Sequence, residues 1–232
     1  MSGIKTIKKW IVPILMLVFY GILREKMVHY IINYRSADFS KSLLIGDFVI
    51  SILLVLLIKL IFKGKFNSID RSKKMSLKKS VLISVATVFV CIIIMFFINK
   101  SLLFVFNPNN IISGNTINII SSIRKNPLPI IGLSFVTSTL EEIVYRQMLF
   151  GYLYDLHKGC NKYIRFITSA LISSVVFGII HDGFFHPAMF YYVTAGIILS
   201  GLYLYTKRLS SSITVHILYN LYSDFKFLLW YI

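Results

Sequence analysis

The chain contains several apolar runs that are each long enough to cross a lipid bilayer, and these runs constrain its fold more than any other feature. A transmembrane helix needs about 20 mostly apolar residues, and the 232 residues have room for about six or seven such runs. Only 15% of the residues are charged, which is low for a soluble domain. The sequence therefore predicts an all-α, polytopic transmembrane helix bundle that forms one domain over residues 1–232. A soluble domain with a large core is the disfavoured alternative.

We expect about seven spans, with six or eight crossings as alternatives. The expected spans cover about residues 8–23, 43–62, 81–98, 129–153, 164–180 and 189–205, and a last span runs from about residue 211 to residue 222 or beyond. The first span follows lysines as a secretory signal does, but no small-residue cleavage site comes after it, so we expect an uncleaved helix. Residues 107–127 are rich in Asn and Ser, which indicates a loop.

The net charge of +16 is concentrated between the apolar runs. Under the positive-inside rule, loops rich in Lys and Arg lie in the cytoplasm. The basic segments 5–9, 63–79, 158–165 and 207–208 are then all cytoplasmic. This distribution predicts a multi-pass protein of the cell membrane with a cytoplasmic N-terminus. It also indicates that the partner of the basic segments is the lipid bilayer and not a nucleic acid.

Two adjacent carboxylates, Glu141 and Glu142, lie inside the fourth expected span. A charged side chain at the centre of a bilayer costs about 2.5–3.5 kcal/mol, so such residues usually face the bundle interior and serve a function. Arg146 lies four residues after Glu142, in the favourable order for an ion pair. Glu141 is rotated by about 100° on an α-helix and is less compensated, which suits a general base. The alternative is that all three residues form a structural salt-bridge network.

Two further polar pairs lie on later spans. Phe177 and His181 are four residues apart, and so are His216 and Asn220, so each pair shares one face of its helix. A single histidine in an apolar helix is usually a packing residue. Two histidines, an asparagine and a carboxylate pair on three spans that can converge favour a catalytic site instead. Asp182, next to His181, is a secondary candidate. It could orient His181, but we favour the simpler interpretation that it marks the outer end of its helix.

These residues support hydrolysis. Glu141 and His181 can hold and deprotonate a water molecule. His216 and Asn220 can donate hydrogen bonds to the oxyanion of a tetrahedral intermediate. Counted at about 1.5 Å per residue from the cytoplasmic helix ends, His181 lies deeper than Glu141 and His216 lies shallower. Convergence therefore requires tilted helices or shifted helix ends.

Two alternatives for the reacting group stay open. Glu141, His181 and His216 would be a reasonable zinc-ligand set with an open fourth position, but no His-Glu-x-x-His helix is present, so the spacing does not require a metal. We expect that no cofactor is required. The other alternative is a serine nucleophile, although none of the candidates has an evident base beside it: Ser134, Ser138 and Ser173.

Taken in order, the three motifs resemble those of the CAAX protease and bacteriocin-processing family of intramembrane endopeptidases, also called the Abi family, which includes the type II CAAX prenyl endopeptidases. The motifs are Glu141-Glu142-xxx-Arg146, Phe177-xxx-His181 and His216-xxx-Asn220. The resemblance implies a helical catalytic core over about residues 128–225 and peptide hydrolysis near the cytoplasmic side.

The resemblance also implies a role for each residue. Glu141 is the water-activating base with His181 as its partner, and His216 and Asn220 stabilise the oxyanion. The supporting residues would be Glu142, Arg146 and Phe177. The motifs are compatible with a glutamate-activated water or with a metal, and we favour the water.

The bias towards Lys, Ile and Asn resembles that of a low-GC bacterium. The resemblance then implies a peptide or a membrane-protein substrate, in bacteriocin maturation or self-immunity. Two other classes of function remain as alternatives: a non-catalytic membrane immunity or scaffold protein, and a proton-coupled transporter. The transporter would be expected to show paired broken helices or repeats, which are not evident in the sequence.

Overall fold

A computed structural model describes residues 66–107 and 128–231, together with isolated positions between residues 46 and 60 and between 111 and 120. Within these ranges every regular element is a helix, as the all-α prediction requires. The first expected span, 8–23, and most of the second, 43–62, lie outside the described residues, and so does most of the loop at 107–127.

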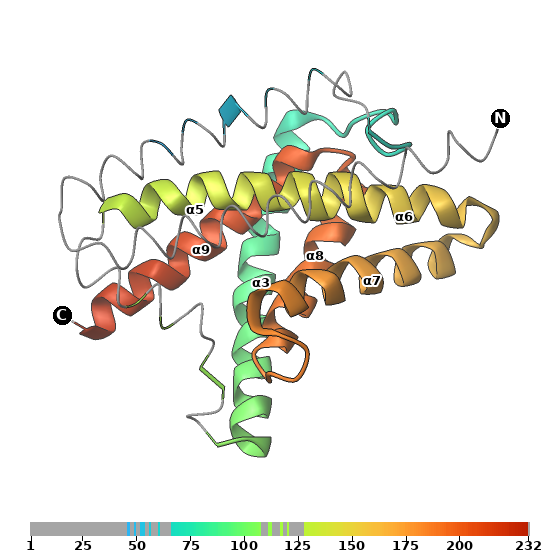
Figure 1. Ribbon diagram of the computed structural model, residues 1–232. Coiled ribbons are helices and arrows are strands. Elements are labelled where there is room, and N and C mark those ends of the chain that lie inside the picture. The colour runs from blue at the N-terminus through green and yellow to red at the C-terminus, as the bar shows by residue number, and fades with distance from the viewer. Residues whose placement is uncertain are drawn as a thin grey trace.

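Each of the five later spans expected from the sequence falls within a helical segment. The elements are α3 (Leu77–Val105), α5 (Leu128–Glu141), the π-helix η2 (Glu142–Phe150), α6 (Gly151–Leu156), the short 3-10 helix η3 (His157–Gly159), α7 (Lys162–Asp182), α8 (Met189–Thr206) and α9 (Leu209–Tyr231). The last helix continues past residue 222, in agreement with an expected span that reaches residue 222 or beyond. α5, η2 and α6 follow one another without a break and form one long rod (Figure 1).

Three of the described helices, α3, α7 and α8, are long and apolar enough to cross a membrane. α3 exposes large apolar side chains along its length, among them Phe89 and Phe104, as a lipid-facing helix does. Its opposite face contributes Cys91 to a cluster with Leu202 of α8 and Val215 of α9. These helices support a membrane location, while the number of seven spans is not confirmed.

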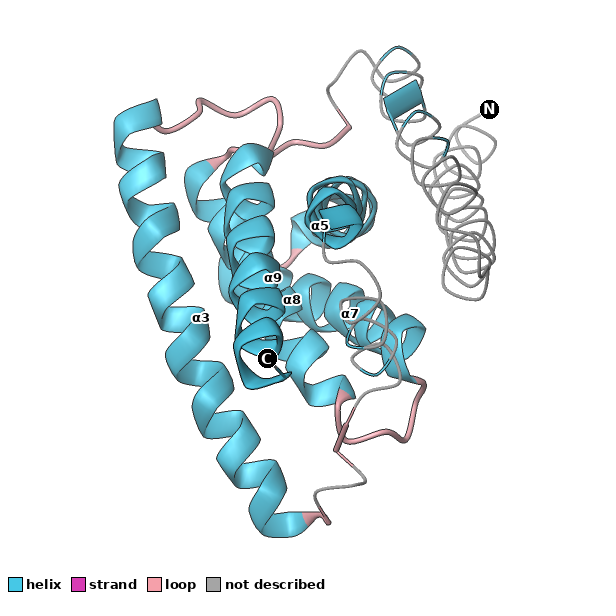
Figure 2. Ribbon diagram, turned by 90° about the vertical axis from the view of Figure 1, so that its left-hand side faces the viewer, coloured by secondary structure: helices cyan, strands magenta, loops and turns pink. Residues whose placement is uncertain are grey.

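α9 lies at the centre of the described bundle, because it contacts α3, α5, α8 and η2. α8 and α9 lie between α3 on one side and α5 and α7 on the other (Figure 2). The rod of α5, η2 and α6 runs across α3, and α9 is inclined to both (Figure 1). This arrangement brings the faces of α5, η2, α7 and α9 together.

α7 and α8 pack closely because small residues line their contact. A Cβ atom added at Gly196 of α8 would lie 2.5 Å from Oγ of Ser174 in α7, so this crossing requires glycine. At its start α7 is capped by Asn161, whose side chain accepts hydrogen bonds from the N–H groups of Tyr163 and Ile164. It ends at Gly183, which has a φ of 76° that a larger residue rarely adopts. The helix therefore ends directly after His181 and Asp182.

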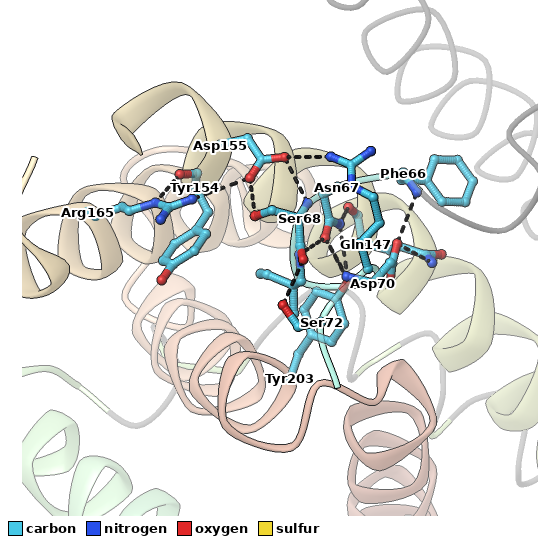
Figure 3. Close-up of polar contacts among 12 residues, drawn as sticks. Phe66, Asn67, Ser68, Asp70, Ser72, Gln147, Tyr154, Asp155, Arg165 and Tyr203 are labelled. Carbon is cyan, nitrogen blue, oxygen red and sulfur yellow. Dashed lines mark hydrogen bonds and ion pairs between the residues drawn. The ribbon is translucent and has the colours of Figure 1, made fainter. Parts of the chain in front are cut away.

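A short segment before α3, residues 66–72, docks on the end of η2, and we call it the docking segment (Figure 3). Its Asn67 is buried, and the side-chain amide donates to the backbone oxygen of Gln147 at 2.6 Å. Gln147 donates in turn from Nε2 to Oδ2 of Asp70 at 2.9 Å. Asn67 also fills the space beside Gly151, where an added Cβ would lie 2.6 Å from Cγ of Asn67. The docking segment therefore fixes the end of the π-helix.

Two carboxylates extend this contact to other helices. Tyr203 of α8 donates to Oδ1 of Asp70 at 2.6 Å. Asp155 of α6 accepts from the N–H of Ser68 at 2.9 Å and lies 3.3 Å from Nη2 of Arg165 in α7. Figure 3 shows these contacts as one continuous network. The docking segment therefore links η2, α6, α7 and α8.

Candidate functional site

The site residues predicted from the sequence lie on three helical segments and meet between them. Glu141 ends α5, Glu142 and Arg146 lie in η2, Phe177 and His181 lie near the end of α7, and His216 and Asn220 lie in the middle of α9. The helices are inclined to one another (Figures 1 and 2), which is one of the two arrangements expected to let residues of differing depth converge.

Glu142 is fully buried and has two partners. Its Oε1 lies 3.2 Å from Nη1 of Arg146 and 2.9 Å from Nδ1 of His216. The guanidinium of Arg146 also lies over the ring of Phe177, 4.4 Å from its centroid. A buried charge is tolerated only when it is paired, and a cation is attracted by the face of an aromatic ring. Glu142, Arg146 and Phe177 therefore form a compensated group.

Glu141 lies between two imidazoles. Its Oε1 is 3.6 Å from Nε2 of His181, and its Oε2 is 3.6 Å from Nε2 of His216. Both separations exceed the usual length of a direct hydrogen bond. A water molecule seated beside such a pair can bond to both partners. This carboxylate, only 2% exposed, is therefore placed to share a water with a histidine.

The orientation of His181 is set by its own helix. Its Nδ1 lies 2.8 Å from the backbone oxygen of Phe177. A carbonyl oxygen only accepts, so Nδ1 carries a proton and donates it to this hydrogen bond, while Nε2 faces Glu141. The imidazole is stacked on Tyr192, with ring centroids 4.4 Å apart, and contacts the ring of Phe177 at the same distance. The group that orients His181 is therefore a backbone carbonyl and not Asp182.

Asn220 lies one turn along α9 from His216 and contacts α5. Its Nδ2 donates to Oγ of Ser138 at 3.0 Å, and Ser138 is fully buried. An amide nitrogen carries two hydrogens, so one N–H of Asn220 remains for another acceptor. The contact also places Asn220 within one turn of Glu141 along α5.

The candidate serine nucleophiles have partners other than histidine. Ser138 accepts from the amide of Asn220, Ser134 donates to the carboxylate of Asp224 at 2.8 Å, and Ser173 donates to the backbone oxygen of Ala170 at 3.2 Å. These contacts favour a structural role for the three hydroxyls. In the described part of the chain, no group of three or more His, Cys, Asp or Glu side chains has the arrangement of a metal site.

Sequence reasoning missed three features of the site. The sequence does not single out Tyr192, because it looks like one more aromatic residue in an apolar helix. The sequence does not predict the π-helical turn either, because the spacing of its polar residues is compatible with an α-helix. The supporting role of Ser138 has a signal in the sequence, because Ser138 lies four residues before Glu142 and therefore shares its helix face.

Comparisons with known proteins fall on the segment that carries the site. Residues 124–222 match the family model described as type II CAAX prenyl endopeptidase Rce1-like. The membrane-embedded CAAX protease MroQ of Staphylococcus aureus (strain USA300) is 38% identical over 110 residues, which are 47% of this chain and 43% of MroQ. The putative membrane peptidase YdiL of Bacillus subtilis (strain 168) is 38% identical over 108 residues, which are 47% of this chain and 41% of YdiL.

The matches therefore span less than half the length of either relative. No solved structure matches the chain. All of the site residues predicted from the sequence lie within residues 124–222. The resemblance indicated by the three motifs is confirmed over this segment.

Proposed function

We propose that this chain is an intramembrane endopeptidase that hydrolyses a peptide bond with an activated water. Its residues 124–222 match the family model of the type II CAAX prenyl endopeptidases. The observation that supports the proposal best is the position of Glu141, with one imidazole 3.6 Å from each of its oxygens. The neighbouring carboxylate of Glu142 is compensated by Arg146 at 3.2 Å. We therefore assign the chemistry to Glu141, which faces both histidines of the site.

In the proposed reaction a water molecule donates one hydrogen bond to Glu141 and the other to Nε2 of His181. The lone pair of the water oxygen then faces the substrate carbonyl. Glu141 takes a proton as the new carbon–oxygen bond forms, and it returns this proton to the leaving nitrogen as the carbon–nitrogen bond breaks. A positioned base of this kind contributes about 10²–10⁴-fold to the rate.

His216 and Asn220 would stabilise the oxyanion. The second N–H of Asn220 is available for this bond, because the first one goes to Ser138. His216 donates from Nδ1 to Glu142 at 2.9 Å, so its Nε2 can donate to an oxyanion only in the imidazolium form.

The proposed substrate is a peptide or another membrane protein of a bacterium, and the proposed process is bacteriocin maturation or self-immunity. The names of the two bacterial relatives support a bacterial membrane peptidase, and the composition of the chain is that of a low-GC bacterium. The process itself is proposed from the resemblance of the three motifs alone. Membrane proteomes of cells carrying the wild type and Glu141→Gln can be compared by mass spectrometry. Cleavage products that disappear with the variant identify the substrate.

The direct test is the nearly isosteric variant Glu141→Gln, assayed in liposomes with a library of internally quenched peptides. We expect a folded protein whose cleavage rate is about 10²–10⁴-fold lower, because the amide cannot take the proton. The matched control is Asp182→Asn, which removes a nearby carboxylate of no proposed role and should cleave normally. Cleavage at the wild-type rate by Glu141→Gln would exclude Glu141 as the base. If a cellular function survives in a chain with both Glu141→Gln and His181→Ala, the non-catalytic immunity or scaffold function is favoured instead.

The need for a metal is tested separately. Elemental analysis of purified, active protein is expected to show no stoichiometric zinc, because Glu141 and His181 suffice to hold the water. A content of one zinc atom per chain, lost in His181→Ala, would contradict the glutamate-activated water. The mechanism would then use a metal-bound water instead.

A further inference from the structure

The facing sides of α5–η2 and α9 carry three hydrogen-bonded pairs at matched spacing, which we call the polar ladder. The pairs are Ser134 with Asp224 at 2.8 Å, Ser138 with Asn220 at 3.0 Å, and Glu142 with His216 at 2.9 Å. Residue numbers rise by four from pair to pair on the first helix and fall by four on α9. Residues four apart share a helix face. The opposite direction of the numbering shows that the two helices run antiparallel and that the three pairs follow one line of contact between them.

Two pairs of the polar ladder hold groups of the proposed chemistry, and the third does not. His216 and Asn220 belong to the site, whereas Ser134 and Asp224 lie one turn further along. Asp224 is only 6% exposed, and a buried carboxylate in an apolar helix is expensive and usually has a function. Among the described residues, the ion pairs of the structure leave Asp224 without a cationic partner. Its contact with Ser134 therefore needs an explanation other than charge pairing.

We propose that Asp224 and Ser134 are positioning residues, which set the rotation and the lengthwise position of α9 against α5. This inference rests on the proposed function, because the groups that it positions are His216 and Asn220. A helix rises about 1.5 Å per residue, so a slide of α9 by less than one residue already moves these groups by about the distance that costs 10²-fold in rate. The third pair lies beyond Asn220 and resists such a slide and the accompanying rotation.

The loss of this pair should leave the bundle folded. α9 is also held by apolar contacts, in which Val215 packs with Cys91 of α3 and Leu202 of α8. The expected defect is therefore a misplaced site in a folded protein. Such a defect lowers kcat, while the peptide still binds with nearly the wild-type KM.

The test compares three variants in the liposome peptide assay. Asp224→Asn keeps an acceptor oxygen of the same shape and should retain kcat close to that of the wild type. Asp224→Leu removes the acceptor and should lower kcat by about 10- to 100-fold at nearly constant KM. Ser134→Ala removes the donor with a minimal change of volume and should lower kcat in the same way. The matched control is Ser173→Ala, whose hydroxyl bonds only to its own helix, and it should leave kcat unchanged.

A chain with both Ser134→Ala and Asp224→Leu should be no slower than the worse single variant, because both changes break one contact. Circular dichroism and thermal unfolding in detergent report whether each variant folds, and Ser134→Ala keeps the test valid if Asp224→Leu does not fold. Full kcat in folded Ser134→Ala and Asp224→Leu would overturn the inference, as would additive losses. A loss in Asp224→Asn as large as in Asp224→Leu would also overturn it, since the charge would then matter and not the contact. Glu141→Gln is measured in parallel, so that the two proposals can be separated. If Glu141→Gln remains active, the proposed function is wrong. If Glu141→Gln is inactive while the variants of Ser134 and Asp224 keep full activity, only the positioning role of the polar ladder is refuted.

Discussion

Whether Gly151→Ala stabilises or destabilises the protein should depend on the side chain at position 67. A Cβ built on Gly151 would lie 2.6 Å from Cγ and 3.1 Å from Cβ of Asn67, closer than non-bonded carbons normally approach. Forcing a methyl group into a filled site costs about 1–3 kcal/mol. In addition, a displaced Asn67 loses its bond to the backbone oxygen of Gln147, a bond worth about 0.5–1.5 kcal/mol. Alanine is favoured over glycine in a helix by about 1 kcal/mol, which offsets only part of this loss.

Gly151→Ala should therefore destabilise the wild-type protein by about 0.5–3.5 kcal/mol, once the gain in helix propensity is subtracted. In a chain that already carries Asn67→Gly the obstructing side chain is absent. The same Gly151→Ala should then stabilise the protein by up to about 1 kcal/mol. The assay is denaturant-induced or thermal unfolding of the four proteins in detergent, analysed as a double-mutant cycle. Equal effects of Gly151→Ala in both backgrounds would refute the close contact between Asn67 and Gly151 at the start of α6.

Three further predictions concern the site and the helix packing. Arg146→Met should destabilise the protein by about 3–5 kcal/mol, because it leaves the buried charge of Glu142 without its cation. Unfolding of the variant in detergent measures this loss, and wild-type stability of Arg146→Met would contradict the ion pair. Tyr192→Leu should lower kcat of peptide cleavage while Tyr192→Phe retains it, since the stacking on His181 needs the ring; equal rates would show that the stacking is not needed. Gly196→Val should prevent the close approach of α7 and α8 and lower the unfolding temperature of the purified protein, and an unchanged temperature would contradict the close packing at this crossing.

The parts of the site that the sequence predicts are those that depend on local spacing. Glu142 and Arg146 are four residues apart, and the ion pair between them is present at 3.2 Å. The two histidines could be selected because a polar side chain is unusual in an apolar helix. That His181 and His216 reach opposite oxygens of one carboxylate could not be predicted, because it depends on how three helices are inclined.

The parts that the sequence does not predict depend on contacts between distant positions. Asn67 and Gln147 are 80 residues apart, and neither is unusual in its local context. Asp224 and Ser134 resemble ordinary residues near helix ends until the facing helices are seen together. The π-helix at Glu142–Phe150 was missed because no residue in it forbids an ordinary α-helix. The number of spans stays a prediction, since the first two expected spans lie outside the described residues.

The docking segment has a consequence for the synthesis of the protein. A ribosome releases residues 66–72 long before their partners, because 133 residues separate Asp70 from Tyr203. During that time the polar side chains of the segment lack their partners on the later helices and must be hydrogen-bonded by water instead. The histidine and the asparagine of α9 emerge later still. A chain whose synthesis has not reached α9 therefore lacks both His216 and Asn220, so any peptide-cleaving capacity that needs them arises only after residue 220 has been made.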